Sequence, residues 1–472
     1  MPAFHVVNFG CRASQADGAA LKRQLLEAGF TPSERAEASE IAVLNTCTVT
    51  SAADAEVRQF IRRIHRANPH CRILVTGCYA QRAPEEIAQL PGVAWVVGNS
   101  HKHQIAEVLR EKQESGTRFQ NSEFRILAPE SRATVFVGEI AEEFHFAPVF
   151  PDDATRPTLK VQDGCDARCA FCVIPQVRGP SRSLPPETVV AQVRELAEMG
   201  YQEIVLSGIN LGSYGRDLDR RITFLGLLEE ILGETPMPRV RISSIEPMDV
   251  TPELIRLVAG EPRLARHFHV PLQSGCDRTL RAMNRRYWAR HYAERVQAIR
   301  QQIPDCGVGA DVMVGFPGET EGDHQSSLAF IESLPLTYLH IFPYSARPGT
   351  PAAARGGQLN GRILHERGRE MRAVMEKKRQ SFLEAQVGRE ISAVTLDAEE
   401  QGARLALTTN YLKVLLPCSA ARPNALLDVQ VGRMEGGALW GYVAAAAPRG
   451  HAAAASGQDE MFPSEFLRCD NA

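Results

Sequence analysis

The feature of this sequence that decides the fold is the stretch Cys165-Asp166-Ala167-Arg168-Cys169-Ala170-Phe171-Cys172. Its three thiols are spaced so that one short loop can bring them to one face of a metal centre. They cannot close a four-ligand site alone, because no fourth Cys or His follows at zinc-ribbon spacing. The spacing favours a [4Fe–4S] cluster that keeps one iron open. A zinc site completed by a distant residue, or three unrelated core cysteines, remain as alternatives.

Length and composition bound the class of protein. A chain of 472 residues predicts about three domains, each able to bury its own core. With a net charge of −3, the protein as a whole does not attract nucleic acids. A nucleic acid would have to bind at a local patch of basic residues. Eleven cysteines in so long a chain indicate metal ligation in a reducing compartment rather than a disulfide scaffold. With neither a signal-peptide pattern nor a long apolar run, we expect a soluble, cytoplasmic protein without membrane segments.

The N-terminal region repeats one pattern, an apolar strand that ends at a cysteine. The strands are expected at Ala3–Asn8, Glu40–Asn45 and Arg72–Thr76, and they lead to Cys11, Cys47 and Cys78. Helical patterns such as Asp17–Ala28 alternate with them, which predicts a parallel α/β domain. Ligands bind at the carboxyl ends of parallel strands, so these cysteines are expected to converge in a second candidate metal site. Buried cysteines without a metal are the alternative, and Cys71 is left out because it starts its strand.

The longest region, 158–382, predicts a partial (β/α)6 TIM-type barrel. Its strands are expected at Thr158–Gln162, Glu203–Leu206, Arg239–Ser243, His267–Pro271, Gly309–Val314 and Tyr338–Phe342, with amphipathic helices between them. Functional residues of such barrels follow the strands. Small and polar residues stand there, namely Ser207, Gly208, Asn210, Ser244, Glu246, Gln273, Ser274, Gly315, Gly318, Tyr344 and Ser345.

The rest of the chain divides by composition. Residues 1–110 form the predicted N-terminal α/β domain, and the polar, proline-containing segment 111–157 is expected to be a linker. Arg362–Arg389 is basic but interleaved with glutamates, as in a solvated helix. Short alternating strands from about Glu390 to Val443 predict a small C-terminal β-barrel domain over 383–445. The alanine-rich tail, 446–472, is expected to be disordered.

Taken together, the six cysteines and their neighbours resemble the methylthiotransferase family of radical S-adenosylmethionine (SAM) enzymes over nearly the whole chain, up to about Val443. The motifs that carry the resemblance are Gly10-Cys11, Asn45–Thr50, Thr76–Gln81, Asp163–Pro175, Arg178–Ser183, Leu272–Gly275 and Val314–Thr320. The resemblance implies an N-terminal cluster domain, a radical SAM partial barrel and a C-terminal RNA-binding barrel of the TRAM type. It therefore implies two [4Fe–4S] clusters, one on Cys165, Cys169 and Cys172 and one on Cys11, Cys47 and Cys78.

Within this family, different branches modify different targets. Asn45–Thr50, Thr76–Gln81 and the segments Gln273–Asp277 and Met283–Tyr287 resemble the branch that modifies threonylcarbamoyladenosine in tRNA. The alternatives are the branches that act on isopentenyladenosine in tRNA or on a ribosomal-protein aspartate, and a non-enzymatic RNA-binding protein with structural clusters. The short, weakly basic C-terminal barrel and the alanine-rich tail depart from the family pattern, which weakens the expectation of phosphate contacts there.

The chemistry that the resemblance implies is removal of an unactivated hydrogen from C2 of an adenine. No side-chain acid or base can do this, so the cofactor must. The cluster on Cys165, Cys169 and Cys172 is expected to cleave SAM to a 5′-deoxyadenosyl radical, and the second cluster to hold the sulfur that is inserted and methylated by another SAM. The implied partners are the anticodon stem-loop of tRNA, an electron donor such as flavodoxin or ferredoxin, and a sulfur source that the sequence does not identify.

The resemblance also suggests SAM contacts, each with a plainer alternative. Phe171 is expected near the adenine of SAM or as support for the loop. Ser207, Gly208 and Asn210 are expected at the SAM amino group or in a strand-end turn. Gln273 and Ser274 are expected to face the ribose of SAM or the substrate. Gly315 and Gly318 would let the backbone approach the adenine, or would form an ordinary turn.

Two basic groups have candidate anionic partners. Arg178 and Arg182 are expected to bind the SAM carboxylate or an RNA phosphate, or to form a structural ion pair. The run Arg285-Arg286-Tyr287-Trp288 is expected to be an RNA-stacking patch or an ordinary helix N-terminus. No role is expected for Cys276, Cys306, Cys418 and Cys469.

Overall fold

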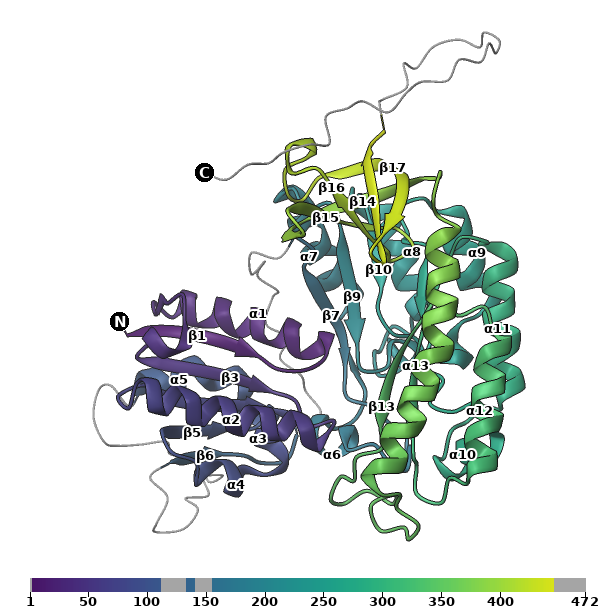
Figure 1. Cartoon of the computed structure of the whole chain (residues 1–472). Coiled ribbons are helices and arrows are strands. Elements are labelled where there is room, and N and C mark those ends of the chain that lie inside the picture. The colour runs from purple at the N-terminus through teal and green to yellow at the C-terminus, as the bar shows by residue number, and fades with distance from the viewer. Residues whose placement is uncertain (1, 112–132, 141–154, 445–472) are drawn as a thin grey trace, which may run out of the picture. The chain divides into compact units, whose positions relative to one another are not determined.

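The computed structural model describes residues 2–111, 133–140 and 155–444 (Figure 1). The chain forms two compact units, Met1–Ser381 and Phe382–Ala472. Most of the predicted linker and all of the predicted tail lie outside the described residues. Within the described part of the chain, no helix combines the length and the apolar character that crossing a bilayer requires.

The N-terminal sheet of the first unit has six parallel strands in the order β2-β1-β3-β4-β5-β6. The strands are β1 Ala3–Asn8, β2 Thr31–Pro32, β3 Ile41–Thr46, β4 Arg72–Gly77, β5 Val93–Val97 and β6 Thr134–Phe136. The helices are α1 Arg12–Glu27, α2 Ser51–Ala67, α3 Cys78–Arg82, α4 Pro84–Ala88 and α5 Ile105–Glu111. Every residue of β3 is buried, as expected for a central parallel strand covered by helices on both faces. The predicted parallel α/β domain is confirmed.

The second part of this unit contains six parallel strands whose order in space follows their order in the chain. They are β7 Thr158–Asp163, β9 Ile204–Gly208, β10 Val240–Ile242, β11 His267–His269, β12 Gly307–Val314 and β13 Tyr338–Pro343. β10-β9-β7 and β11-β12-β13 are two hydrogen-bonded groups, joined by single parallel bridges Val240–Leu264 and Ser244–His269. The short β8, Arg182–Ser183, pairs antiparallel with β7 at the edge. This arrangement confirms the predicted partial (β/α)6 barrel.

Helices connect these strands and cover them. They are α6 Ile174–Arg178, α7 Pro186–Glu198, α8 Phe224–Glu234, α9 Pro252–Gly260, α10 Asp277–Ala282, α11 Ala289–Gln302, α12 Glu321–Ser333 and α13 Gly361–Glu384. Short 3₁₀ turns occur at Ala36–Ala38, Asn99–Gln104, Leu211–Ser213, Pro247–Asp249 and Cys418–Ala420. α13 ends before the predicted Arg389, because the left-handed Gly388 turns the chain into the next strand.

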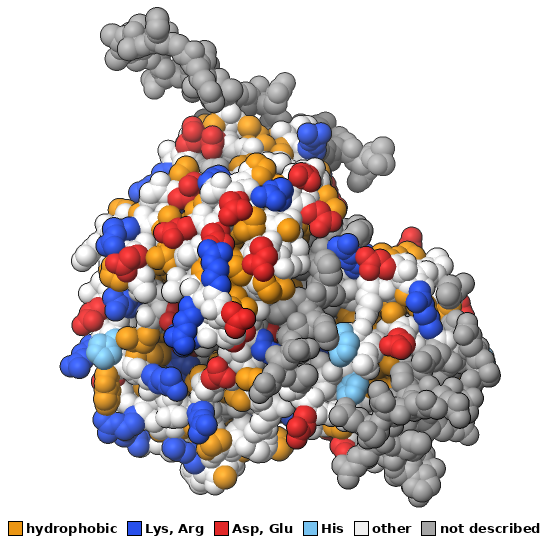
Figure 2. Space-filling model, turned by 180° about the vertical axis from the view of Figure 1, so that it is seen from behind, with side chains coloured by type: hydrophobic (Ala, Val, Ile, Leu, Met, Phe, Trp, Pro, Cys, Tyr) orange, Lys and Arg blue, Asp and Glu red, His pale blue; other side chains and the backbone are white. Residues whose placement is uncertain are grey.

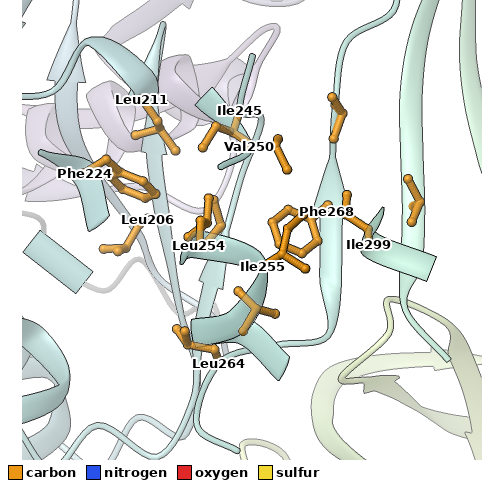
Figure 3. Packing of buried hydrophobic residues seen from close by; sticks show 14 of the residues in the cluster. Leu206, Leu211, Phe224, Ile245, Val250, Leu254, Ile255, Leu264, Phe268 and Ile299 are labelled. Carbon is orange, nitrogen blue, oxygen red and sulfur yellow. The ribbon is translucent and has the colours of Figure 1, made fainter. Parts of the chain in front are cut away.

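The main hydrophobic core lies between the barrel strands and their helices. Figure 3 shows Leu254 and Ile255 of α9 close to Phe268 of β11 and Ile299 of α11. Phe268 is fully buried in this layer, while its neighbours His267 and His269 point to the opposite face of the strand. The outer face of β11 therefore builds the core and the inner face is free to carry polar groups.

The second unit contains a closed barrel of five strands in the order β14-β15-β16-β18-β17. The strands are β14 Glu390–Glu400, β15 Ala403–Thr408, β16 Lys413–Leu416, β17 Leu426–Glu435 and β18 Ala438–Val443. Its interior is filled by small and branched side chains such as Ala393, Val414 and Leu439. The predicted small β-barrel is confirmed, and closure removes the open strand edges.

A buried carboxylate at the start of β9 balances several arginines. Glu203 has no exposed surface; it accepts hydrogen bonds from Arg241 at 2.8 and 3.1 Å and from Arg156 at 3.0 Å, and Arg239 lies 3.7 Å away. Burial alone would raise the pKa of Glu203, but the arginines, Arg241 foremost, lower the pKa to about 2. This ion cluster ties the segment before β7 to β9 and β10.

We predict that Glu203→Gln destabilises the first unit by about 3–5 kcal/mol at neutral pH, because buried guanidinium groups lose their counter-charge. The lowered pKa means that the stabilisation is complete above the unfolded-state pKa and is lost as pH falls towards 2, so the difference from wild type should shrink below about pH 4. Urea unfolding at several pH values measures both effects.

The matched control is Glu253→Gln, which removes the partner of Arg256 on the surface of α9. Its unfolding midpoint should stay at the wild-type value. Equal midpoints for Glu203→Gln and wild type at neutral pH would contradict the assigned role of Glu203.

Candidate metal and cofactor site

The cysteine loop begins where β7 ends. Gly164 follows Asp163 with φ of +70°, and a Cβ at this position would lie 1.8 Å from the carbonyl oxygen of Pro180. Only glycine fits this close backbone approach. The backbone N–H of Cys165 donates to Gly179 O at 3.1 Å, so the loop leaves the strand in a fixed direction.

Cys165, Cys169 and Cys172 lie on the one loop between β7 and α6, in which the backbone N–H of Cys172 donates to Cys169 O at 3.1 Å. Burial, with smaller contributions from Cys169 and Cys165, raises the pKa of Cys172 to about 12, although a backbone N–H bond at Ile174 acts in the opposite direction. N–H donors surround these sulfurs, since Ala167 N lies 3.4 Å and Asn210 Nδ2 3.8 Å from Cys165 Sγ. Such donors suit thiolates bound to a cluster, because they stabilise negative charge on sulfur.

The cysteines of the N-terminal domain also converge from three strand ends. Cys11 precedes α1, Cys47 follows β3 and Cys78 begins α3. Burial, then the charges of Cys78 and Cys11, raise the pKa of Cys47 to about 12. Gly10 lies against Cys47, where a Cβ would come within 2.9 Å of its sulfur. These contacts and the neighbouring places of β1, β3 and β4 in the sheet are consistent with the predicted convergence, and the role of the three cysteines as metal ligands stays a prediction.

Donors also face this second group of sulfurs. Arg178 Nε donates to Cys78 Sγ at 3.2 Å, and Asn99 Nδ2 donates to the same sulfur at 3.6 Å. Cys11 Sγ lies 3.8 Å from Ser14 Oγ. Each group of three cysteines thus has polar donors aimed at a sulfur atom, which suits thiolates that bind a cluster.

Arg178 joins the two groups of cysteines. Its guanidinium, 2% exposed, donates to both carboxylate oxygens of Asp163 at 2.9 Å, to Asp17 at 2.9 Å and to Cys78 Sγ. Asp163 stands just before the Gly164-Cys165 turn. Asp17 lies on α1, the helix that begins at the residue after Cys11. Of the alternatives for Arg178, the structure supports the structural ion pair.

Two lysines complete the buried network around Arg178. Lys102 donates to Asp17 at 3.0 Å, and Lys160 contacts Asp17 and donates to Asp163 at 2.7 Å. Three cations thus face two carboxylates, which leaves an excess of positive charge next to Cys78 Sγ. Burial alone would raise the pKa of Asp163, but Arg178 and Lys160 lower it to about 2. The excess positive charge favours an anionic sulfur group at this place.

Of the predicted SAM residues at the end of β9, Asn210 lies beside Cys165. Ser207 and Gly208 close the strand, and Gln162 Oε1 accepts from the backbone N–H of Asn210 at 2.7 Å. Asn210 Nδ2 points to Cys165, while its Oδ1 is buried and has no hydrogen-bond partner among the described residues. An unpaired acceptor beside the cluster loop fits a ligand with N–H groups, such as the amino group of SAM.

Gln273 offers a similar unpaired acceptor after β11. It adopts a left-handed conformation with φ of +66°, which is strained for a residue with a side chain. Its Oε1 is buried without a hydrogen-bond partner among the described residues. Ser274 is fully buried and accepts from the backbone N–H of Cys276 at 3.2 Å, so it supports the loop.

The glycine motif and Phe171 lie around a small apolar cluster. Phe171 packs with Phe316 and Tyr344, and Gly318 lines a cavity of about 370 Å³ together with Phe316 and Arg355. Gly315 faces Leu364 and therefore serves packing. Phe171 is partly buried against this cluster, as expected of a residue that supports the loop, and its contact with SAM stays a prediction.

The predicted RNA-stacking patch is wrong for two of its residues. Tyr287 is 4% exposed and its hydroxyl donates to Leu272 O at 2.7 Å. The Arg285 side chain, 6% exposed, contacts Glu246 and donates to Cys169 Sγ at 3.3 Å. Both side chains point inward beside the cysteine loop. Arg286 is exposed, and the guanidinium of Arg281 lies over the ring of Trp288. Sequence reasoning missed Arg285 and Asn99 as donors to sulfur, since nothing in their local pattern reveals such long-range contacts.

We predict that Cys47 and Cys172 of the cluster-free protein react with iodoacetamide about tenfold faster for each unit of pH increase between 7 and 9. Their raised pKa values, about 12 each, keep both as neutral thiols over this range, and only the thiolate reacts. Mass spectrometry of peptides labelled anaerobically measures the rates. Cluster assembly must release the same protons and should likewise improve with pH.

The control is the same protein in urea, where these thiols should reach their maximal rate near pH 9. A plateau below pH 9 in the folded protein would contradict the burial of these cysteines.

Comparison with known proteins agrees with this geometry. Residues 3–98 match a family described as "Uncharacterized protein family UPF0004", and residues 159–331 match the "Radical SAM superfamily". The chain is 38% identical to the threonylcarbamoyladenosine tRNA methylthiotransferase MtaB of Aquifex aeolicus, over 86% of this chain and 94% of that protein. It is 35% identical to MtaB of Bacillus subtilis, over 91% and 93% of the two chains.

Another relative carries a different substrate in its name. The tRNA-2-methylthio-N(6)-dimethylallyladenosine synthase of Moorella thermoacetica is 31% identical, over 92% of this chain and 96% of that protein. Among solved structures, the radical SAM methyltransferase TsrM of Kitasatospora setae aligns with a TM-score of 0.55 at 16% identity, over 74% of this chain and 76% of that one. This last likeness shows the fold alone.

Proposed function

The chain belongs to the methylthiotransferase family of radical SAM enzymes, and from this premise we propose that it adds a methylthio group to C2 of N6-threonylcarbamoyladenosine at position 37 of tRNA. Membership makes it an enzyme that uses SAM and [4Fe–4S] chemistry. The observation that carries the choice of substrate is the 38% identity with the Aquifex aeolicus MtaB over 94% of its length.

The second candidate substrate is N6-isopentenyladenosine in tRNA. Relatives named as dimethylallyladenosine synthases reach 31–34% identity over similar lengths, and two of the MtaB relatives, at 33% and 32%, fall in the same range. The MtaB relatives from Aquifex and Bacillus, at 38% and 35%, exceed that range and favour threonylcarbamoyladenosine.

The proposed cofactors are two clusters with three cysteine ligands each. Cys165, Cys169 and Cys172 would hold one, and Cys11, Cys47 and Cys78 the other. The first site would supply radical chemistry for removal of the C2 hydrogen when its cluster and SAM are bound, and the second would hold the sulfur for transfer. An external electron donor, such as flavodoxin or ferredoxin, and cytoplasmic tRNA as the substrate complete the proposal.

The chain's own residues would position these groups. Asn210 Oδ1 and Gln273 Oε1 are unpaired among the described residues and can accept N–H groups of SAM or of the nucleoside. Arg285 lies against Cys169 and Arg178 against Cys78, so each proposed cluster has one buried cation at a ligand sulfur. These cations stabilise the negative charge that thiolate-bound clusters carry.

Contacts with tRNA would rely on local basic groups. Figure 2 shows Lys and Arg side chains mixed with Asp and Glu over most of the visible face, with a group of basic side chains towards the lower left. Such a surface, together with the net charge of −3, suits local phosphate contacts rather than broad attraction of RNA. The C-terminal barrel, which we assign as TRAM-like, would add RNA contacts.

The function is tested by the modified nucleosides of tRNA from cells with and without this protein. We predict that loss of the protein abolishes 2-methylthio-N6-threonylcarbamoyladenosine and leaves unmethylthiolated threonylcarbamoyladenosine in its place. The control is re-expression of the wild-type chain beside Cys169→Ala, of which only the first should restore the product. An unchanged level of this nucleoside, with loss of 2-methylthio-isopentenyladenosine instead, would favour the second candidate.

The two-cluster proposal is tested by iron content after anaerobic reconstitution. We predict about eight irons per wild-type chain and about four for Cys47→Ala, because only the N-terminal cluster loses a ligand. Cys71→Ala is the matched control: it is also a buried cysteine next to a strand of the same sheet, but it precedes β4 and lies 3.9 Å from Ser39 Oγ. About four irons in the wild type, or a loss in Cys71→Ala equal to that in Cys47→Ala, would contradict the proposal.

A further inference from the structure

Three neighbouring strands of the barrel place two histidines and an aspartate side by side. His269 lies on β11, Asp311 on β12 and His340 on β13. His269 pairs with Gly309 and His340 pairs with Asp311, and residues two apart on a strand share a face. One nitrogen or oxygen atom from each of the three side chains lies within 4.8 Å of the others.

The contacts within this group leave one nitrogen without a hydrogen bond. His340 Nδ1 lies 3.2 Å from Asp311 Oδ1 in hydrogen-bonding geometry. His269 Nε2 is buried and lies at the same 3.2 Å from that oxygen, but it makes no hydrogen bond among the described residues. A buried imidazole nitrogen in this position requires a further group.

The distances match those between ligands of one metal ion. Zinc lies about 2.0–2.2 Å from histidine nitrogen and carboxylate oxygen, so at angles of about 90–110° its ligands lie roughly 3.0–3.5 Å apart. The two 3.2 Å separations fall in this range. An ion shared by the three side chains would also use the unpaired Nε2 of His269.

The outer contacts of His269 have the form found around metal-bound histidines. Its other ring nitrogen, Nδ1, lies 2.7 Å from Ser244 Oγ. Such a bond from the far ring nitrogen fixes the orientation of the ring and leaves Nε2 for the metal. Tyr338 stacks on the ring of His269 with centroids 6.0 Å apart, and this contact also holds it in place.

The charge of the group suits a divalent cation. Burial alone would raise the pKa of Asp311, but the imidazoles of His269 and His340 hold the pKa below its ordinary value, so the carboxylate is ionised. Two imidazoles and one carboxylate form a donor set typical of zinc and similar transition metals. The His340 side chain is 63% exposed, so an ion can reach the group from solvent.

We propose that His269, Asp311 and His340 form a binding site for one divalent metal ion of the zinc class, separate from both groups of cysteines. Three protein ligands leave at least one coordination position for water or for an oxygen of a bound molecule. The site uses residues within the strands β11, β12 and β13, whereas the cysteines stand after strands β1, β3, β4 and β7.

The test measures zinc bound by the holoenzyme, in which the clusters already occupy the cysteines. After anaerobic dialysis against zinc chloride and removal of free metal, we expect one zinc per wild-type chain. His340→Ala should lower the affinity for zinc at least tenfold. Ser244→Ala should lower it about tenfold, because the ring of His269 loses the hydrogen bond that fixes its orientation. The matched control is His365→Ala, an exposed histidine on α13 that should bind zinc like wild type.

Zinc-edge X-ray absorption distinguishes this site from a cysteine site. We expect only nitrogen and oxygen neighbours, including two imidazoles. Sulfur neighbours, or equal zinc binding by wild type and His340→Ala, would overturn the proposal. Absence of bound zinc in the wild type would also overturn it, and would identify the three side chains as a hydrogen-bonded group only. Because His340 is on the surface, circular dichroism should show that His340→Ala keeps the fold.

Discussion

The rest of the first unit depends on the buried guanidinium of Arg178. It contacts Asp163 before the cysteine loop, Asp17 on the helix after Cys11, and the sulfur of Cys78. A buried cation of this kind is tolerated only when its donors are paired, and removal of one partner leaves the others unbalanced. The same group therefore fixes the N-terminal sheet to the barrel and sets the positions of both groups of cysteines.

This network also bears on how thiols in apolar surroundings would serve as the proposed cluster ligands. Burial, as the largest cause, raises the pKa values of Cys47 and Cys172 to about 12 and so favours their neutral thiols. The cations Arg178 and Arg285, which contact Cys78 and Cys169, act in the opposite direction. The positive iron ions of a bound cluster would lower the pKa of these thiols further. The buried cations and the metal would therefore both favour the cysteine thiolates.

The parts that the sequence could predict are those governed by a local rule. Strand ends in a parallel sheet meet at one edge, so Cys11, Cys47 and Cys78 were expected together and Cys71 was not. The same rule located Asn210 and Gln273 after barrel strands. It could not show that Arg285 and Tyr287 turn inward, because their partners Cys169 and Leu272 are chosen by tertiary packing and not by neighbouring residues.

The histidine and aspartate group escaped prediction for a related reason. Barrel sites are sought in the loops after strands, whereas His269 and Asp311 stand within them. Their neighbours Phe268, Ala310 and Val312 are fully buried in the layer below the helices, so the alternation of β11 and β12 turns the polar residues to the inner face. Sequence alternation reveals that such a face exists, but only the register between strands brings His269, Asp311 and His340 to one point. A buried nitrogen that makes no hydrogen bond among the described residues is costly in a packed barrel unless a ligand uses it, and this cost is the physical reason to assign the group a binding role.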